Sequence, residues 1–326
     1  MSNGVSPTLN IAYLGPEASF SHQAAIEVFS PSTNILHPVP SFSAIFSAIQ
    51  SSTHDFAVIP IENSTNGSVV QVLDLLSQCG LDSSAAYPDL EVVAEYYLPV
   101  HHCLFVSSTS TNPDIRTIYT HPQVWGQCNK YLSSNFPPNQ VERIDVGSTS
   151  AAAQLVSRDG DASNAAIASK LAGQRHNLIC LAENIEDEPG SNTTRFFVVR
   201  NRHQRTPGLE QYLSSRPNQK QKYKSLITFT IPHTKPGALA DALAVFNQYH
   251  FNLTSIDTRP SRKRNWQYVF FVECEEADNR NTSSIDDEEE NLKNLLTDLQ
   301  KFTESLRHLG RFQDQLLRED GIHSKS

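Results

Sequence analysis

The 326-residue chain lacks several features that mark large classes of proteins. No apolar run approaches the roughly 18 residues that a membrane-spanning helix needs, so we predict a protein that works in water. The five cysteines are scattered and never form a Cys-x-x-Cys pair, which indicates neither a disulfide framework nor a zinc site. The adjacent His101 and His102 point to opposite faces of a regular strand and cannot ligate one metal, so we predict no metal site. A phosphate-binding loop, a dinucleotide glycine fingerprint and a nucleophile elbow are also missing, so we predict no cofactor.

Positive charge is scarce relative to negative charge. The chain has 26 Lys and Arg against 35 Asp and Glu, a formal net charge of −9. This balance argues against nucleic acid as a partner, and the basic cluster 262–264 is too short to reverse it, so we interpret the cluster as a hairpin tip. The predicted first strand begins within about ten residues of Met1, without a cationic segment followed by an apolar one. We therefore predict no targeting segment and a cytoplasmic location.

The chain is too long for one hydrophobic core at the usual roughly 100 to 200 residues per domain, so we predict two domains. Residues 9–200 alternate short apolar strands with amphipathic helices, which is typical of an α/β domain. Two such sets follow one another, and a strand at 195–199 returns to the first set. We therefore predict two lobes joined by two crossings, with a ligand-binding cleft between them. The first lobe is predicted over about 9–90 plus 177–200, and the second over about 91–176.

A composition shift marks the end of this domain. Residues 201–223 are rich in Arg, Gln, Pro, Ser and Lys, and we interpret them as a solvated linker or a loop with one short helical turn. In 224–318 the order is strand, helix, strand, strand, helix and a final strand near 312–317, which is the ferredoxin-like pattern. The last helix is predicted over 292–306, and the acidic run 286–290 before it is predicted as a solvated loop.

Three segments place hydroxyl or amide side chains directly before a helix, where free backbone N–H groups and the helix dipole favour an anion. Ser19 precedes the first helix, and Ser148 and Thr149 stand at the start of a later one. The third segment, 62–68, holds more polar side chains than a simple turn requires. Its candidate residues are Asn63, Ser64 and Gly67. Together these segments predict a site for a carboxylated substrate.

Thr194, Arg195 and Phe196 stand where an acidic polar loop enters an apolar strand, and such a strand mouth is a common place for chemistry. On a regular strand Thr194 and Arg195 face opposite sides. If Thr194 points into the cleft, we expect Arg195 to pair with an acidic residue such as Glu62 and to support the lobe wall. Contact with substrate is the alternative role for Arg195.

Five segments resemble the prephenate dehydratase family in their order and spacing. They are 11–22 (IAYLGPEASFSH), 58–68, 120–127, 148–152 and 192–199 (NTTRFFVV). Two later segments resemble the phenylalanine-binding motifs of the ACT regulatory domain that this family carries, namely 235–239 (KPGAL) and 252–261 (NLTSIDTRPS). The second motif usually reads Glu-Ser-Arg-Pro, whereas this chain has Asp257 and Thr258 in the first two places. We expect this change to alter effector affinity rather than effector identity, because it shifts the reach of two side chains.

The resemblance implies an α/β, two-lobed, periplasmic-binding-protein-like catalytic domain over 9–200 and a ferredoxin-like (βαββαβ) ACT domain over 224–318. It implies the conversion of prephenate to phenylpyruvate, carbon dioxide and water, with feedback regulation by phenylalanine. It assigns to Thr194 the assistance of the departing hydroxyl group. Substrate binding is implied for Ser19, Asn63, Ser64, Gly67, Ser148, Thr149, Arg195 and Phe196. Effector binding is implied for Gly237, Ala238, Leu239, Asn252, Asp257, Thr258, Arg259 and Pro260.

Effector sites of this kind resemble those formed between two paired domains, so we predict a homodimer or a dimer of dimers. Two other functions stay open at this point. Arogenate dehydratase performs the same chemistry on the transaminated substrate, and the expected lack of a transit peptide favours prephenate. A non-catalytic sensor would also use a two-lobed cleft and an amino-acid-binding domain, but it has no need of Thr194 in its Thr-Arg-Phe context.

Overall fold

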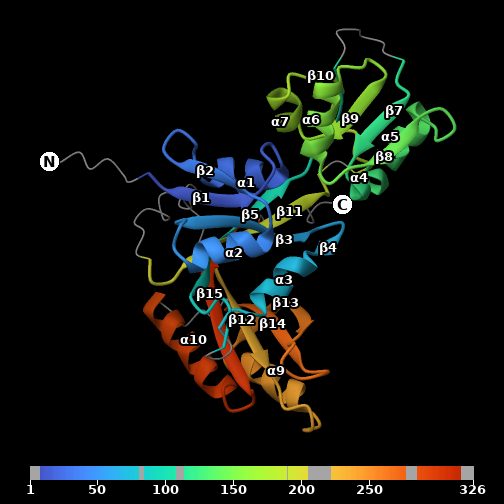
Figure 1. Cartoon of the computed structure of the whole chain (residues 1–326). Coiled ribbons are helices and arrows are strands. Elements are labelled where there is room, and N and C mark those ends of the chain that lie inside the picture. The colour runs from blue at the N-terminus through green and yellow to red at the C-terminus, as the bar shows by residue number, and fades with distance from the viewer. Residues whose placement is uncertain are drawn as a thin grey trace, which may run out of the picture. The chain divides into compact units, whose positions relative to one another are not determined.

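The computed structural model describes residues 8–80, 84–107, 114–188, 190–204, 222–276 and 285–316 (Figure 1). These residues form three sheets with helices packed on them. They fall into two compact units. One unit is drawn from Met1–Ala48, Thr53–Val69 and Leu98–Phe196, and the other from Ile49–Ser52, Val70–Tyr97 and Phe197–Ser326.

The first sheet has six strands, and long apolar runs occur in its central strands. In sheet order the strands are β2 (Ile35–Val39), β1 (Asn10–Leu14), β3 (Phe56–Asn63), β11 (Thr193–Asn201) and β5 (Leu90–Pro99), with β4 (Gly67–Ser68) paired to the end of β3. The helices between these strands are α1 (Phe20–Val28), α2 (Phe42–Gln50) and α3 (Val70–Leu76). β1 pairs parallel with β2 and β3, and Ile11, Ala12 and Val58 are fully buried. Such near-continuous apolar strands are typical of a parallel sheet covered on both faces.

The second sheet is mixed and has five strands. In sheet order they are β10 (Ile179–Ala182), β6 (Cys103–Val106), β9 (Asn164–Ala168), β7 (Thr117–Thr120) and β8 (Glu142–Asp145). Its helices are α4 (Pro122–Gln127), α5 (Asn129–Asn135), α6 (Thr149–Asp159) and α7 (Lys170–Arg175). All five residues of the central strand β9 are buried. Leu104, Ile118 and Ile167 belong to the core cluster of this sheet, so the expected alternation of strands and helices is confirmed here.

Two strands lie in a different sheet from the one that the sequence predicts. The segment 92–98, expected in the second lobe, is part of β5 and lies beside β11 in the first sheet. The segment 179–182, expected in the first lobe, forms β10 and pairs with β6 in the second sheet. The chain therefore crosses from the first sheet to the second after β5 and returns after β10, and not near residues 91 and 177 as predicted. An apolar pattern predicts a strand, but long-range pairing decides which sheet the strand joins.

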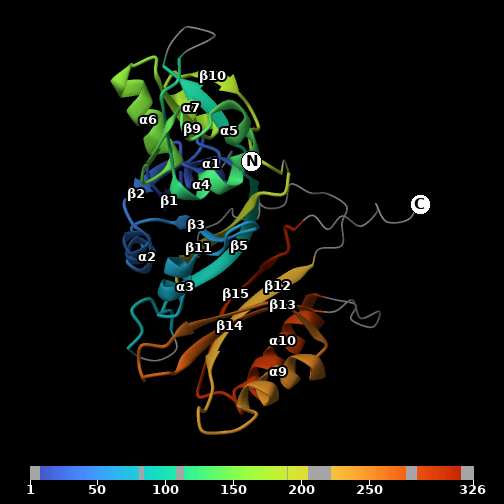
Figure 2. The same cartoon turned by 90° about the vertical axis from the view of Figure 1, so that its right-hand side faces the viewer.

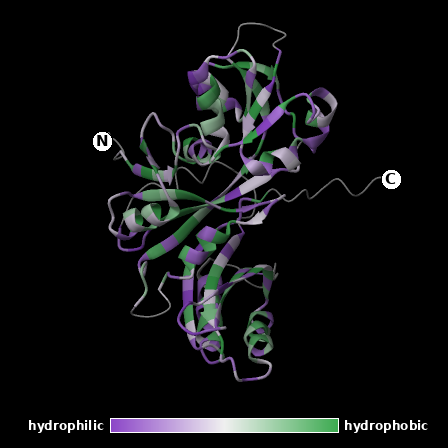
Figure 3. Cartoon of the chain, turned by 45° about the vertical axis from the view of Figure 1, so that its right-hand side comes forward, coloured by the Kyte–Doolittle hydropathy of each residue, from purple (hydrophilic) through white to green (hydrophobic). Residues whose placement is uncertain are grey.

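The third sheet is antiparallel and forms the C-terminal domain. In sheet order its strands are β13 (Phe251–Pro260), β14 (Tyr268–Glu276), β12 (Tyr223–Thr230) and β15 (Ser305–Gln313). α9 (Ala238–Gln248) and α10 (Ile285–Leu299) lie together on one face of this sheet (Figure 2). Hydrophobic and hydrophilic residues alternate along the strands (Figure 3), and the core between sheet and helices includes Ile227, Phe246 and Leu295. The predicted ferredoxin-like order of elements is confirmed.

The last helix and strand begin earlier than the sequence predicts. α10 begins at Ile285, so the acidic run 286–290 lies in its first turns and not in a loop. Acidic residues are favourable at that end of a helix because they face the positive end of the dipole. β15 occupies 305–313 instead of 312–317, and it pairs with β12 from Tyr223 to Thr230. This pairing decides the strand, because the sequence SLRHLGRFQ has little intrinsic preference for one.

Parts of the predicted linker and of the ACT domain lie outside the described residues. These are 205–221 of the linker at 201–223, and 277–284 and 317–318 of the domain at 224–318. The domain boundaries inferred from the sequence therefore stay predictions. Within the described ranges, no helix is long and apolar enough to cross a membrane.

A buried ion cluster surrounds Lys224 on β12. Its Nζ lies 3.3 Å from Glu95 Oε1, 3.8 Å from Glu273 Oε1 and 2.9 Å from Asp314 Oδ1. The four side chains are between 0% and 5% exposed. One cation therefore faces three carboxylates in the interior, and the sequence pattern did not indicate this arrangement.

Candidate functional site

Thr194 and the loop after β3 meet through the amide of Asn63. Asn63 Nδ2 lies 3.0 Å from Thr194 Oγ1 and 2.8 Å from Asn192 Oδ1. The oxygen of the same amide accepts hydrogen bonds from the backbone N–H groups of Thr65 and Asn66, each at 3.0 Å. These bonds define the orientation of the amide, because only its nitrogen can donate. Thr194 Oγ1 therefore accepts from Asn63, and its own proton is left to donate elsewhere.

Two hydrogen bonds of the Ser64 hydroxyl link the same loop to the start of β11. Its hydroxyl donates to the backbone oxygen of Ser191 at 2.6 Å and accepts from the backbone N–H of Thr193 at 2.9 Å. Gly67 pairs with Asn63 where β3 meets β4, and its φ of +77° suits a glycine. The three predicted residues of this loop therefore lie together beside the start of β11.

Arg195 and Phe196 continue β11 into the interior. Arg195 is 8% exposed and Phe196 is 1% exposed, whereas Thr194 is half-buried. Glu62, the predicted partner of Arg195, is exposed. Burial of the guanidinium is what a supporting role requires, and its pairing with Glu62 stays a prediction.

Ser19 and Ser148 cap the helices that follow them. The Ser19 hydroxyl accepts from the backbone N–H of His22 at 3.2 Å and donates to the backbone oxygen of Leu14 at 3.0 Å. The Ser148 hydroxyl accepts from the backbone N–H of Ala151 at 3.0 Å. Capping therefore accounts for both hydroxyl groups, and their contact with a substrate stays a prediction.

The start of α6 contacts the loop that precedes α1. Ser150 Oγ donates to the backbone oxygen of Glu17 at 2.5 Å, and Arg175 Nη2 pairs with Glu17 Oε2 at 2.6 Å. Thr149, the first residue of α6, is 6% exposed. The predicted site residues thus form two groups, one around the starts of α1 and α6 and the other around Asn63. Contact of both groups with one substrate stays a prediction.

A polar cluster that sequence reasoning missed lies next to the crossings between the first two sheets. Glu186 Oε1 is 2.7 Å from His101 Nδ1, and Glu186 Oε2 accepts from the backbone N–H of His102 at 3.0 Å. Burial alone would raise the pKa of Glu186, but these two hydrogen bonds hold it below its ordinary value. His102 Nε2 lies 2.8 Å from Gln127 Oε1, and burial lowers the pKa of His102. The pair of adjacent histidines was the only feature of the sequence that could have indicated this cluster. The ring of His101 and the backbone N–H of His102 both bind the carboxylate of Glu186.

The described part of the chain contains no group of three or more His, Cys, Asp or Glu side chains placed to hold a metal ion. The groups around Asn63 and at the starts of α1 and α6 offer amide, hydroxyl and backbone N–H groups. Such groups can bind anions and donate hydrogen bonds to a leaving oxygen.

The predicted effector residues are divided between the two ends of β13. Gly237 has a φ of +80° and caps α9, and the loop that contains it follows the end of β12. The register places that end of β12 at the same end of the sheet as Pro260, and it places Asn252 at the opposite end. One chain therefore does not bring Gly237 and Asn252 together.

Arg259, another predicted effector residue, pairs with a helix outside the third sheet. Its Nε lies 2.5 Å from Asp74 Oδ1, and Arg262 Nη2 lies 3.1 Å from Asp74 Oδ2. Asp74 is on α3, the helix that directly follows the loop of Asn63 in the chain. The three residues belong to the same compact unit. The ion pair thus connects the predicted effector strand to the segment that follows the candidate active-site loop.

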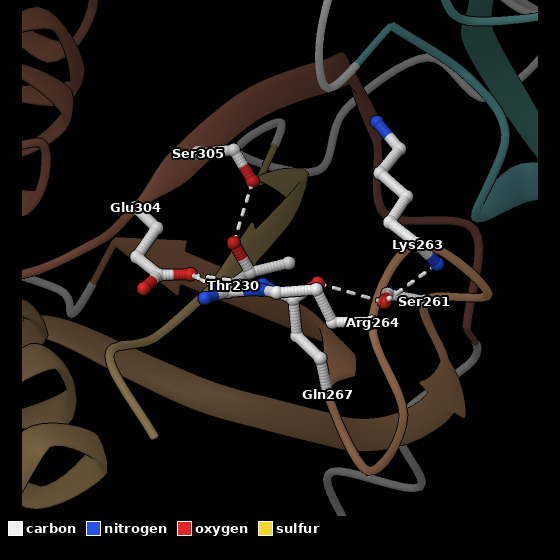
Figure 4. Close-up of a pocket in the computed structure, with 7 residues that line it drawn as sticks. All are labelled: Thr230, Ser261, Lys263, Arg264, Gln267, Glu304 and Ser305. Carbon is white, nitrogen blue, oxygen red and sulfur yellow. Dashed lines mark hydrogen bonds and ion pairs between the residues drawn. The ribbon is translucent and has the colours of Figure 1, made fainter. Parts of the chain in front are cut away.

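A cavity of about 260 Å³ lies at the Pro260 end of the third sheet (Figure 4). Its lining residues are Thr230, Ser261, Lys263, Arg264, Gln267, Glu304 and Ser305. Ser261 Oγ is 2.8 Å from Gln267 Oε1, and Gln267 Nε2 donates to Glu304 at 2.8 Å. These contacts stabilise the tip between β13 and β14, where the basic cluster 262–264 lies as predicted. None of the lining residues is a predicted effector residue, so the cavity does not identify the effector site.

Comparison with known proteins identifies the families to which the two parts of the chain are similar. The sequence profile described as prephenate dehydratase matches residues 11–204, and the profile of the ACT domain matches residues 225–302. The chain belongs to the prephenate dehydratase family. The resemblance drawn from the sequence motifs is confirmed.

Individual relatives agree with this assignment. A probable prephenate dehydratase of Saccharomyces cerevisiae is 35% identical, over 82% of this chain and 87% of the relative. An arogenate dehydratase/prephenate dehydratase 1 of Arabidopsis thaliana, described as chloroplastic, is 32% identical over 97% of this chain and 75% of the relative. The crystal structure of a prephenate dehydratase from Arthrobacter aurescens in complex with L-Phe is 25% identical, with a TM-score of 0.74 over 94% of this chain and 90% of that chain. The predicted α/β fold with a C-terminal ACT domain is confirmed.

Proposed function

We propose that this chain catalyses the decarboxylating dehydration of prephenate to phenylpyruvate, carbon dioxide and water. The observation that carries the proposal is the hydrogen bond from the Asn63 amide to the Thr194 oxygen in a chain of the prephenate dehydratase family. This bond leaves the Thr194 proton free to assist a departing oxygen.

Loss of hydroxide is the difficult part of the reaction. Hydroxide is a poor leaving group, so a donor must assist it while the C–O bond breaks. A threonine hydroxyl is far too weakly acidic to serve as a free proton reservoir. Thr194 therefore acts as a positioned hydrogen-bond donor, and the proton that completes the water molecule comes from solvent.

The substrate is a dianion, whereas the protein has a formal net charge of −9. Positive potential must therefore be concentrated locally. The backbone N–H groups at the starts of α1 and α6 and the polar loop around Asn63 can supply it. Phe196 contributes an apolar wall, and loss of carbon dioxide becomes easier when a carboxylate leaves bulk water for a less solvating pocket.

The test is to supply purified protein with prephenate or with arogenate, each with and without phenylalanine. Phenylpyruvate is followed by its ultraviolet absorbance in alkali, and the phenylalanine formed from arogenate is assayed separately. We expect turnover of prephenate that added phenylalanine suppresses. No turnover of either substrate, with tight phenylalanine binding intact, would favour the non-catalytic sensor.

Arogenate dehydratase is the second candidate, because the Arabidopsis thaliana relative is described with both activities. The two substrates differ in carrying an ammonium or a keto group on the side chain. A higher kcat/KM for arogenate than for prephenate would replace the first assignment by the second. A cytoplasmic location for this chain stays a prediction.

Feedback by phenylalanine is proposed to act through the ACT domain of a homodimer or a dimer of dimers. β13 is one of the two edge strands of the third sheet, and Leu253 and Ile256 on it are 36% and 49% exposed. An exposed edge of this kind can pair with a second copy. Pairing of two β13 strands about a two-fold axis would bring Asn252 of one copy to the Gly237 end of the other. Pairing of two copies would thus complete the divided effector site, which supports the dimer.

Asp74 is proposed to transmit the feedback signal, because it joins the effector strand to α3. We expect Asp74→Ala to reduce the ratio of activities without and with saturating phenylalanine by about fivefold or more, the lower range of allosteric coupling. The kcat/KM without phenylalanine should stay within about threefold of the wild type. Initial rates over a range of phenylalanine concentrations measure both quantities.

The matched control is Glu183→Gln, which removes a 2.8 Å ion pair with Lys170 in the other compact unit. This variant should keep the wild-type response to phenylalanine. If Asp74→Ala also keeps that response, the ion pair with Arg259 does not carry the signal.

A further inference from the structure

The side-chain amide of Asn192 is buried, and among the described residues its nitrogen has no hydrogen-bond partner. Asn192 is 5% exposed, and its side-chain oxygen accepts a hydrogen bond from Asn63 Nδ2 at 2.8 Å. Among the described residues none accepts a hydrogen bond from Asn192 Nδ2. A buried amide N–H without a partner is costly and uncommon in native proteins, so it calls for a ligand.

The orientation of this amide follows from its neighbours. The oxygen of Asn63 accepts from two backbone N–H groups, those of Thr65 and Asn66, so the nitrogen of Asn63 must face Asn192 and Thr194. The atom of Asn192 nearest that nitrogen must then be its oxygen. Asn192 Nδ2 is therefore the unpaired atom, and reversing the amide would place two donors against each other.

The backbone of Asn192 is held in place. Its carbonyl oxygen accepts from the backbone N–H of Val100 at 2.8 Å, next to the crossing that follows β5. Asn63 Nδ2 contacts both Asn192 Oδ1 and Thr194 Oγ1, so the free donor of Asn192 and the hydroxyl of Thr194 belong to one rigid group.

We propose that Asn192 Nδ2 is the second hydrogen-bond donor to the ring hydroxyl group that leaves the substrate. This inference rests on the proposed function, in which Thr194 is the first donor. The departing oxygen carries lone pairs for two donors, and two donors share the charge that develops on it.

The reaction step balances without a proton from Asn192. The electron pair of the C–C bond to the carboxylate enters the ring, and carbon dioxide is released. The electron pair of the C–O bond departs with the oxygen as hydroxide, which takes a proton from solvent to become water. Asn192 keeps its proton and only stabilises the developing charge.

Asn192→Asp separates this role from a purely structural one. The aspartate keeps an oxygen that accepts from Asn63, but it replaces the free N–H by an oxygen. We expect kcat for prephenate to fall about 10²- to 10³-fold, the usual effect of losing one donor to a developing oxyanion, with KM within about threefold. Asn139→Asp, which adds the same charge at an exposed position before β8, should leave kcat nearly unchanged.

Asn192→Ala tests the proposal without introducing a buried charge, so it serves if the aspartate variant does not fold. It should lose kcat to a similar extent, with its melting temperature recorded alongside. An Asn192→Asp or Asn192→Ala protein with wild-type kcat would overturn the proposal. So would a rise in KM at unchanged kcat, because it would place Asn192 against a part of the substrate that does not react.

Failure of this inference can be told apart from failure of the proposed function. A wild-type protein that turns over neither prephenate nor arogenate overturns the function itself. If the wild-type protein and the Asn192→Asp variant are equally active, only the proposal that Asn192 is the second donor is overturned.

Discussion

Thr194→Ala is expected to lower kcat for prephenate about 10²- to 10³-fold, the effect typical of removing one donor from a developing negative charge. KM should change little, because the hydroxyl acts mainly when the C–O bond breaks. Asn63 Nδ2 donates to Thr194 Oγ1 at 3.0 Å, so the threonine proton is already directed away from that amide. Initial rates of phenylpyruvate formation over a range of prephenate concentrations measure both constants.

Two matched variants control this experiment. Thr194→Ser keeps the hydroxyl and should retain most of the activity. Thr193→Ala removes a hydroxyl from the neighbouring residue, which faces the opposite side of β11, and should keep kcat within about threefold. A Thr194→Ala protein with unchanged kcat would remove Thr194 from the mechanism.

Lys224→Met is expected to lower the free energy of unfolding by about 3–5 kcal/mol, because removing one partner of a buried ion pair leaves the other charge unpaired. Nζ of Lys224 lies 2.9 Å from Asp314 Oδ1 and 3.3 Å from Glu95 Oε1, and the exposure of the three side chains is between 0% and 5%. Methionine fills a similar volume but supplies no charge. Denaturant unfolding followed by circular dichroism measures the loss.

Lys293→Met is the matched control, because Lys293 is 74% exposed and lies 3.6 Å from Glu290 on α10. Exposed pairs of this kind contribute little, so the free energy of unfolding should change by less than about 1 kcal/mol. Equal losses in the two variants would show that the buried cluster contributes no more than a surface pair.

The same cluster predicts a dependence of stability on pH. Burial alone would raise the pKa of Asp314, but hydrogen bonds from Lys224 and from the backbone N–H of Leu316 hold it below its ordinary value of 3.8. A lowered carboxyl pKa contributes stability above the unfolded pKa, and this stability is lost as pH falls through the folded pKa. Lys224→Met removes one of these bonds, so its acid unfolding should begin at a higher pH.

The sequence predicted the local parts of the candidate site well. A polar loop after a buried strand and a threonine at the mouth of another strand are both local patterns. The structure joins these two segments by a hydrogen bond. Asn63 Nδ2 lies 3.0 Å from Thr194 Oγ1, although 131 positions separate the two residues in the chain. Asn192 was not singled out, because a single asparagine in a polar loop has no local pattern that indicates a buried, unpaired donor.

The placement of strands was harder to predict than their existence. The segment 92–98 was predicted as a strand of the second lobe, but it belongs to the first sheet. The segment 179–182 was predicted only as part of the first lobe, and it forms a strand of the second sheet. An apolar alternation reports that one or both faces are buried, whereas sheet membership depends on hydrogen bonds to residues far away in the chain. β15 shows the same effect, because its pairing with β12 outweighs a sequence that includes two arginines, a histidine and a glycine.

The sequence by itself determined the family, the α/β class, the ferredoxin-like order of the C-terminal elements and the two segments that carry Asn63 and Thr194. These properties depend on motif order and on local periodicity, which the linear chain already contains. Only the tertiary structure decided that Asn63 orients Thr194, that Asn192 keeps a free donor, that Arg259 pairs with Asp74 and that one buried lysine faces three carboxylates. Each of these depends on distances between residues remote in sequence, and those distances are set only when the sheets pair and the helices pack.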